Sequence, residues 1–330
     1  MTREEALTAF LEQNGWVDAC RIPLAADASF RTYERLIKGG KSVVLMNSPL
    51  SERPDQFVLI DGLLCQAGVH APAILASDTA NGFLLLEDFG DNTFSRLLAS
   101  GTDELSLYRT GIDTLIQIQK NVKIPETGIS EYTFQTFMNG TLFLTDWFGR
   151  YVVPGGMSED ARQEFIDLWT PLIHRLTDLP KALVLMDYHV DNLMMTPAGD
   201  CGVLDFQDAR IGPVTYDLMS LLEDERRDVS PAVREKLLNY YFSQCPDLDT
   251  PAIKQALSVT AVQRHTRVIG IFVRLALRDK KERYLKMIPA IWRQIEQHLD
   301  QPLFSRYRDW LNRYVPLEVR YTVFNPQGDI

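Results

Sequence analysis

Hydrophobic and polar positions in the first ninety residues predict a small β-rich unit. RTYERLIK (31–38) and KSVVLMN (41–47) have strand character, and the Gly39-Gly40 pair between them is a two-glycine hairpin signal. A helix follows at DQFVLIDGLLCQAG, which Gly68 ends, and two further strands are expected at AILAS and FLLLEDF. The order of elements is therefore strand, strand, helix, strand, strand.

The pattern after Asp91 is almost entirely helical, with one exception. LVLMD (183–187) and CGVLDF (201–206) are short apolar stretches typical of strands. The simplest organisation is an α+β architecture of two lobes. We expect a small β-rich N-terminal lobe and a larger, mostly helical C-terminal lobe, formed by residues 1–88 and 89–330.

Composition and charge argue against several classes of protein. Apolar residues make up 45% of the 330 residues and charged residues 24%, which is ordinary for a globular protein. The formal charge of −10 argues against nucleic-acid binding. No apolar run approaches the ~18 residues of a membrane span. Thr2 and Glu5 form a capping-box pattern in an acidic amphipathic segment that is not a signal peptide, so a cytoplasmic protein is expected.

The cysteines carry no metal-binding or disulfide pattern. The chain has 4 of them, far apart and without a CxxC pair. Such spacing argues against both a zinc site and a disulfide framework.

A crowded polar stretch, VLMDYHVDNLM, lies between apolar flanks in the middle of the chain. It brings Asp187, His189, Asp191 and Asn192 together, and Asp205 follows at the end of a second apolar strand. Two strands that end side by side would bring Asp187, Asn192 and Asp205 to one pocket. Phosphoryl transfer requires that set, because one carboxylate accepts the proton of the attacking hydroxyl while an asparagine and a second carboxylate hold Mg²⁺. A hydrolase with a metal triad of Asp187, His189 and Asp191 is the rival, but no second histidine cluster completes it.

This stretch resembles the catalytic loop of the aminoglycoside phosphotransferase and choline kinase family, and Asp-Phe-Gln stands where that family carries its metal-binding aspartate. The resemblance covers nearly the whole chain. It implies a two-lobed protein-kinase-like fold that transfers phosphate from ATP, with Mg²⁺, to a hydroxyl of a small molecule. It also implies that Asp187 is the catalytic base, that His189 braces the catalytic loop, and that Asn192 and Asp205 are the metal ligands.

The expected nucleotide site in the small lobe departs from the family pattern. Met46 stands where the third strand should end in lysine, so the phosphates need another cation. Arg31 is the best placed, and Ser29 offers its hydroxyl and N–H in a loop that has no glycine. LLLEDFG resembles the hinge of such kinases, where backbone groups of Glu87 and Phe89 would contact adenine. The missing lysine also leaves open a nucleotide-binding pseudokinase without turnover.

A narrower resemblance indicates the acceptor. DASFRTYERL, LDFQDARIGPVTYDLMSLLED and GIFVRLALRDKKERYL look like the anomeric amino-sugar kinases of cell-wall recycling. Those enzymes phosphorylate N-acetylmuramate and N-acetylglucosamine at the C1 hydroxyl. Asp208 and Arg210 follow the metal motif directly and are expected to bind the acceptor. A cationic aminoglycoside or a choline-type molecule is the alternative acceptor.

One expected helix, VTAVQRHTRVIGIFVRLALRDK, is basic along one side. Helical periodicity puts Arg264, Arg267, Arg274 and Arg278 within about 80° of arc. A solvated face is the favoured interpretation. In the other interpretation, part of the stripe faces the acceptor, where an arginine would bind a lactyl carboxylate through two hydrogen bonds.

Overall fold

The chain divides into two compact units in the computed structural model. The model describes residues 2–24, 30–124, 128–153 and 155–322. One unit is formed by Met1–Thr127 together with Leu185–Ala209, and the other by Gly128–Val184 together with Arg210–Ile330. The chain therefore passes from one unit to the other three times.

The first unit contains a five-stranded antiparallel sheet with the order β1-β2-β3-β5-β4. Its strands are β1 (Cys20–Pro23), β2 (Thr32–Lys38), β3 (Lys41–Asn47), β4 (Ile74–Asp78) and β5 (Phe83–Leu86). The predicted hairpin between β2 and β3 is confirmed. Gly39 and Gly40 have φ of 56° and 75°, which glycine adopts without the strain that a side chain would bring.

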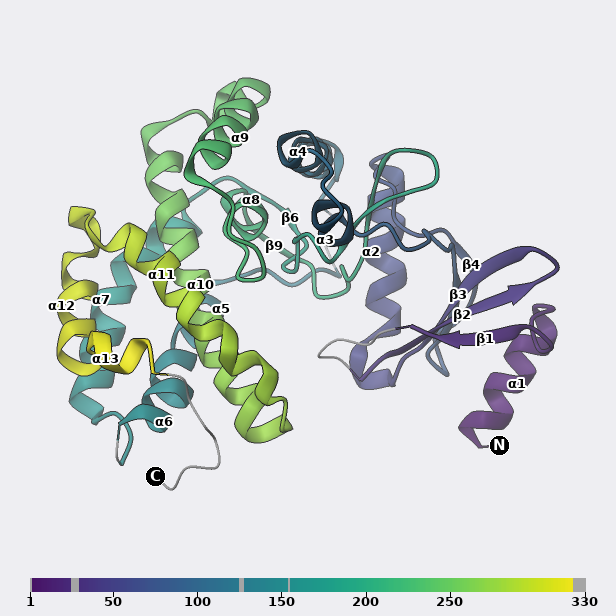
Figure 1. Cartoon of the computed structure of the whole chain (residues 1–330), viewed down its shortest axis with the longest axis horizontal. Helices are drawn as coiled ribbons and strands as arrows, with labels where there is room; N and C mark the ends of the chain where they lie inside the picture. The colour runs from purple at the N-terminus through teal and green to yellow at the C-terminus, as the bar shows by residue number, and fades with distance from the viewer. Residues whose placement is uncertain (1, 25–29, 125–127, 154, 323–330) are drawn as a thin grey trace. The chain divides into compact units, whose positions relative to one another are not determined.

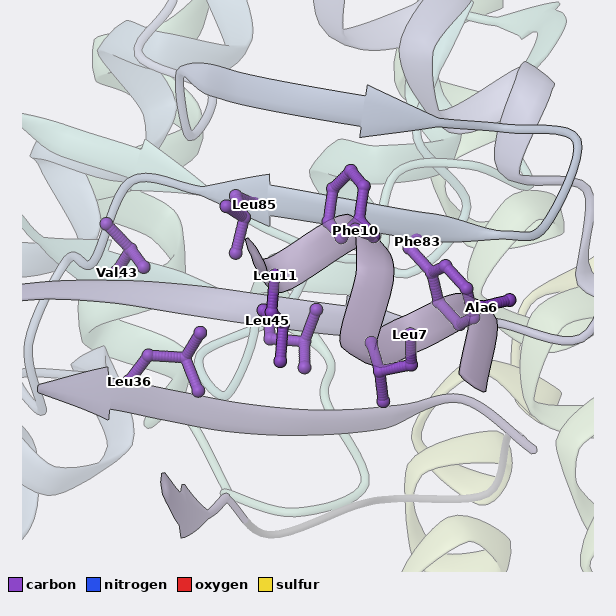
Figure 2. Packing of buried hydrophobic residues seen from close by; sticks show 9 residues of the cluster. All are labelled: Ala6, Leu7, Phe10, Leu11, Leu36, Val43, Leu45, Phe83 and Leu85. Carbon is purple, nitrogen blue, oxygen red and sulfur yellow. The ribbon is translucent and has the colours of Figure 1, made fainter. Parts of the chain in front are cut away.

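Helix α1 (Arg3–Gln13) covers one face of this sheet, as Figures 1 and 2 show. The predicted capping box is confirmed, because the Thr2 side chain accepts from the Glu5 N–H and the Glu5 carboxylate accepts from the Thr2 N–H. The buried cluster between helix and sheet takes four residues from α1, one from β2 and alternate residues from β3 and β5: Ala6, Leu7, Phe10, Leu11, Leu36, Val43, Leu45, Phe83 and Leu85. The opposite face of the sheet therefore carries the other set of side chains.

The remainder of the first unit contains helices, one hairpin and the segments that connect them. Its helical elements are the 3₁₀ turn Leu50–Glu52 and the helices α2 (Pro54–Gln66), α3 (Phe94–Ala99) and α4 (Glu104–Asn121). The hairpin pairs β7 (Leu193–Met195) with β8 (Cys201–Val203). Backbone bonds from Met195 N to Asn92 O and from Val203 N to His70 O join the hairpin to the N-terminal part of this unit.

The second unit is built mostly of helices around α10. Its elements are α5 (Phe134–Thr141), a π-helical turn (Leu144–Gly149), α6 (Arg150–Val152), α7 (Glu159–Thr177), α8 (Thr215–Leu222), α9 (Pro231–Gln244), α10 (Pro251–Asp279), α11 (Ile288–Leu299), α12 (Ser305–Tyr314) and α13 (Leu317–Arg320). Its two strands, β6 (Lys181–Val184) and β9 (Arg210–Pro213), pair with each other. Helix α10 packs against α5, α7, α8 and α11.

The pairing of the central strands differs from the expectation. The strand expected at 183–187 ends at Val184 and pairs with β9, whereas β8, which leads to Asp205, pairs with β7. The two strands that precede Asp187 and Asp205 are therefore not paired with each other. Each short strand takes as its partner another segment of its own unit. Among the described residues, no helix combines the length and apolar character that crossing a membrane requires.

Candidate active site

Residues 185–192 form a loop whose apolar side chains fix its polar ones. Tyr188 is buried, and its hydroxyl donates to the Gly111 carbonyl of α4 at 2.6 Å. Val190 is buried too, and its carbonyl accepts from the Ser95 N–H at 3.1 Å. Asp187, which directly precedes Tyr188 in the loop, is exposed. The apolar flanks therefore hold the loop in place while the Asp187 carboxylate stays accessible.

Two residues of this region adopt left-handed backbone conformations that are uncommon without glycine. Met186, which precedes Asp187, has φ of 75°, and Asp205 has φ of 58°. Such conformations cost about 1–3 kcal/mol each and persist where the surrounding structure enforces them. The strain lies next to the expected base and at one expected metal ligand.

Asn192 links the loop at residues 185–192 to the segment that carries Asp205. Its side-chain amide nitrogen donates to the Asp187 carbonyl at 3.0 Å and to Nε2 of His189 at 3.3 Å. Its own carbonyl accepts from the Leu204 N–H at 2.9 Å, and Leu204 directly precedes Asp205. His189 is buried and braces the Asn192 side chain. The bond between Leu204 and Asn192, at the open end of the β7–β8 hairpin, thus joins the two backbone segments that carry the expected metal ligands.

Asp205 is held by contacts on two sides. The side-chain amide of Gln207 donates to Oδ1 of Asp205 at 2.9 Å, and the Arg31 guanidinium lies 3.4 Å from the same oxygen. Phe206 is buried and packs on Phe57 of α2, with ring centroids 4.7 Å apart. These contacts fix the aspartate while 40% of its side chain stays exposed.

The expected phosphate contacts lie at the start of β2. Met46, in the place of the family's lysine, is fully buried, so it offers no charge. Arg31 is also buried, and it forms ion pairs with Asp205 and with Glu52, the latter at 3.3 Å. Ser29, the other expected contact, lies outside the described residues.

The expected hinge follows β5. The Glu87 N–H donates to the Ala73 carbonyl at 2.9 Å, so this N–H is already engaged beside β4. Phe89 is buried against Gly202, where a Cβ would lie 2.5 Å from the Phe89 ring. Only glycine permits that approach. Of the backbone groups expected to contact adenine, the Glu87 N–H therefore already has a hydrogen-bond acceptor, the Ala73 carbonyl.

His70 ties the hinge to the β7–β8 hairpin, a role that the sequence did not indicate. Its Nδ1 lies 2.9 Å from Asp200 and its Nε2 lies 3.2 Å from Glu87. Its ring also packs edge-on against Phe89. Partial burial acts to lower the pKa of His70, but the hydrogen bonds to Asp200 and Glu87 outweigh burial and raise it. The charged form of His70 is therefore favoured between the two carboxylates.

A second ion pair that the sequence did not indicate holds the other side of the hinge. Nε of Arg35, on β2, lies 2.7 Å from Asp88, and Nη2 donates to the Gly90 carbonyl at 2.9 Å. Partial burial acts to raise the pKa of Asp88, but Arg35 and the Gly90 N–H hold it below its ordinary value. The hinge is thus attached to the sheet as well as to the hairpin.

The two residues expected to bind the acceptor have different surroundings. Asp208 is exposed and belongs to the first unit. Arg210 begins β9 in the second unit, is half-buried, and donates to the Ser130 hydroxyl at 3.1 Å. The partner of the Arg210 guanidinium in this bond is therefore a neutral hydroxyl, not a carboxylate.

The arginine stripe on α10 is not one solvated face, and that interpretation is wrong for its first member. Arg264 is buried, and its guanidinium forms an ion pair with Glu225 at 2.9 Å. Burying a charge requires such a partner. The remaining members have separate contacts: Arg267 donates to the Tyr216 hydroxyl, Arg274 lies over the Phe143 ring, and Arg278 pairs with Asp279.

Metal binding by a larger acidic or histidine cluster finds no support. Within the described ranges, no group of three or more His, Cys, Asp or Glu side chains is arranged to hold a metal ion. The hydrolase triad of Asp187, His189 and Asp191 therefore has no support from the geometry. The pair of Asn192 and Asp205 remains the candidate set of metal ligands.

Comparison with known proteins identifies a family and several relatives. The model of the phosphotransferase enzyme family matches residues 21–253. A protein of Caulobacter vibrioides named N-acetylmuramate/N-acetylglucosamine kinase is 33% identical, over 96% of this chain and 98% of the relative. A protein of Pseudomonas aeruginosa with the same name is 33% identical, over 87% of this chain and 91% of the relative.

Solved structures show the same fold at much lower identity. A choline/ethanolamine kinase family protein from Mesorhizobium loti superposes with a TM-score of 0.65 at 12% identity, covering 94% of this chain and 100% of that one. The ADP-bound aminoglycoside phosphotransferase APH(2'')-Ib gives 0.61 at 13% identity, covering 92% and 98%. The expected protein-kinase-like fold, with a small antiparallel sheet and a mostly helical remainder, is confirmed.

Proposed function

Because the chain belongs to the phosphotransferase enzyme family, we propose that it is an ATP- and Mg²⁺-dependent kinase that phosphorylates the anomeric hydroxyl of an N-acetyl amino sugar. It is a kinase with an alcohol group as acceptor. The observation that carries the choice of acceptor is the match, over nearly the whole chain, to relatives named N-acetylmuramate/N-acetylglucosamine kinase. A role in cytoplasmic cell-wall recycling depends on that acceptor and belongs to the same proposal.

Asp187 is the catalytic base in this proposal. Its carboxylate is exposed, and the strained backbone at Met186 and the anchors at Tyr188 fix its position. A fixed carboxylate orients the acceptor hydroxyl and accepts its proton as the oxygen attacks the γ-phosphorus. His189 takes part by bracing the loop through Asn192.

Asn192 and Asp205 fit a magnesium ion. With the Asn192 amide nitrogen turned to the Asp187 carbonyl, its amide oxygen is left as a ligand, and Asp205 adds a carboxylate that already lies beside a cation, Arg31. Hard oxygen donors of this kind suit Mg²⁺, which takes its other ligands from water and nucleotide phosphates. When bound, the ion supplies neutralisation of phosphate charge.

Residues 1–88 form the nucleotide-binding lobe in this proposal, and residues 89–330 carry the catalytic and acceptor-binding groups. Arg31 and Ser29 contact the phosphates. The carbonyl of Glu87 and the backbone of Phe89 contact adenine, since the Glu87 N–H is engaged by Ala73. The buried Met46 favours one alternative, a pseudokinase that binds nucleotide without turnover.

We expect ATP consumption with N-acetylmuramate and N-acetylglucosamine but not with aminoglycosides or choline. The structures of the latter enzymes share only the fold with this chain, at 12–13% identity. A coupled assay with all four acceptor types measures this. The sugar product should lose its phosphate in mild acid, because an anomeric phosphate is acid-labile while a phosphate on another ring hydroxyl is not. Turnover of choline or an aminoglycoside alone would contradict the acceptor, and no turnover with any acceptor would favour the pseudokinase.

We propose that Asp208 and Arg210 bind the acceptor, and that Arg210 recognises the lactyl carboxylate that N-acetylmuramate has and N-acetylglucosamine lacks. A hydrogen bond to a charged group contributes roughly 1.5–3 kcal/mol, so N-acetylmuramate should be preferred by about 10- to 150-fold in kcat/KM. Arg210→Ala should remove the preference and leave N-acetylglucosamine turnover nearly intact. Arg175→Ala, which removes an exposed arginine bound to Gln255, is the control. An undiminished preference in Arg210→Ala would exclude this role.

A further inference from the structure

Arg31 lies on the same face of the sheet as the position where kinases carry their phosphate-binding lysine. Met46 pairs with Tyr33 across β2 and β3, and directly opposed side chains lie on one face. Leu36 and Leu45 point to the other face, toward α1. Arg31 precedes Tyr33 by two residues, so it continues the row that contains Met46 and Tyr33. The charge missing at Met46 is present on the residue that directly precedes the neighbouring strand, β2.

Glu52 makes two contacts with Arg31 and a third with Phe30, the residue before it. Its carboxylate pairs with Nη2 of Arg31 at 3.3 Å, and its carbonyl accepts from the same nitrogen at 3.0 Å. The other carboxylate oxygen accepts from the Phe30 N–H at 3.4 Å. Glu52 ends a 3₁₀ turn and is followed by Arg53 in a left-handed conformation, so the backbone around it is sharply bent. Glu52 therefore fixes both the side chain of Arg31 and the backbone at Phe30.

The guanidinium bridges Glu52 and the proposed metal ligand. Nη1 lies 3.4 Å from Asp205 while Nη2 lies on Glu52, and only 2% of the Arg31 side chain is exposed. A guanidinium presents several N–H groups in a rigid fork, so it can keep one anion on Nη2 while Nη1 takes another. A lysine ammonium has no such fork. The 3.4 Å contact with Asp205 is longer than an ordinary charged hydrogen bond, which leaves Nη1 able to turn to a phosphate oxygen.

We propose that Arg31 and Glu52 replace the lysine–glutamate ion pair with which protein kinases hold nucleotide phosphates. Arg31 binds the phosphates through Nη1, and Glu52 is the positioning residue that keeps the guanidinium in place. Helix α2, where kinases carry that glutamate, contains no glutamate here. This inference rests on the proposed function, because it assigns the phosphate contacts of that kinase.

Nucleotide binding distinguishes this role from a purely structural one. In calorimetric titrations, Arg31→Met should weaken Mg-ADP by about 10- to 150-fold, the loss expected for a charged hydrogen bond. Adenosine, which has no phosphate, should bind within about twofold of wild type, because its contacts lie elsewhere. The affinity of Arg31→Lys for Mg-ADP should lie between those of wild type and Arg31→Met, because lysine keeps the positive charge but lacks the forked N–H groups.

Glu52→Gln tests the positioning residue. It should weaken Mg-ADP about tenfold and raise KM for ATP more than it lowers kcat. In the double variant Arg31→Met/Glu52→Gln the loss should be no larger than in Arg31→Met, because Glu52 acts through the arginine. The matched control is the Arg21–Glu34 pair on the same sheet, at 2.7 Å, where Arg21→Met and Glu34→Gln should leave Mg-ADP binding unchanged.

The outcomes separate this inference from the proposed function. If wild type binds Mg-ADP and Arg31→Met or Arg31→Lys binds it equally well, the inference is wrong and the kinase function stands. Equal losses of Mg-ADP and adenosine would make Arg31 a structural residue and would also overturn it. If circular dichroism shows that Arg31→Met does not fold, the same comparison of Mg-ADP with adenosine is made with Arg31→Lys and Glu52→Gln. A wild-type protein that binds no nucleotide and turns over no acceptor contradicts the proposed function itself.

Discussion

Asp187→Ala is expected to lower kcat by about 10²–10⁴-fold while ATP binding stays close to wild type. The variant loses the group that accepts the acceptor's proton and orients its hydroxyl. The nucleotide contacts proposed here belong to other residues. Steady-state kinetics with N-acetylglucosamine and a calorimetric titration with Mg-ADP measure the two effects.

Asp191→Ala is the control for Asp187, because Asp191 is an exposed carboxylate of the same loop. It should retain most of the wild-type rate. If Asp187→Ala turns over within about a factor of three of wild type, Asp187 is not the base. Equal losses in the two variants would point to general disturbance of the loop.

Asp205→Asn is expected to weaken binding of Mg-ADP by at least about 100-fold, the upper end of the loss seen when a residue that only supports a metal ligand is changed. Binding of ADP without metal should change little, because the aspartate reaches the nucleotide mainly through the cation. It should even improve slightly, since the variant removes a negative charge beside the phosphates. Titrations with and without Mg²⁺ give both values.

An exposed aspartate of the first unit, Asp55 on α2, provides the comparison for Asp205. Asp55→Asn should leave both titrations unchanged. Loss of the metal dependence only in Asp205→Asn supports its role as a ligand. An unchanged metal dependence in that variant would place the ion elsewhere.

Local patterns predicted the elements that local interactions determine. The Gly39-Gly40 hairpin and the Thr2–Glu5 capping box each involve residues within a few positions, and both are present. The exposure of Asp187 and Asp191 in a loop with apolar flanks also follows from the sequence, because a buried carboxylate would need a partner. The family and the fold were likewise recognisable from the chain.

Contacts between distant segments could not be predicted. Arg31 and Glu52 are 21 residues apart, and His70 and Asp200 are 130 apart, so no spacing rule connects either pair. The pairing of β6 with β9 depends on which short strand finds which partner, and the apolar pattern of each strand does not specify this. Periodicity put Arg264 on a basic stripe but did not reveal Glu225, which allows its burial.

The division of the chain determines when each unit can be completed during synthesis. The first unit needs Leu185–Ala209, and these residues leave the ribosome after Gly128–Val184 of the other unit. The N-terminal sheet and α1 emerge early, but Gly111, Ser95 and His70 wait for the segment that supplies Tyr188, Val190 and Val203. Domains formed by one continuous stretch can fold one after another as they emerge. Here the first unit stays incomplete until Ala209 has emerged, so residues Gly128–Val184 of the second unit have left the ribosome before the first unit can close.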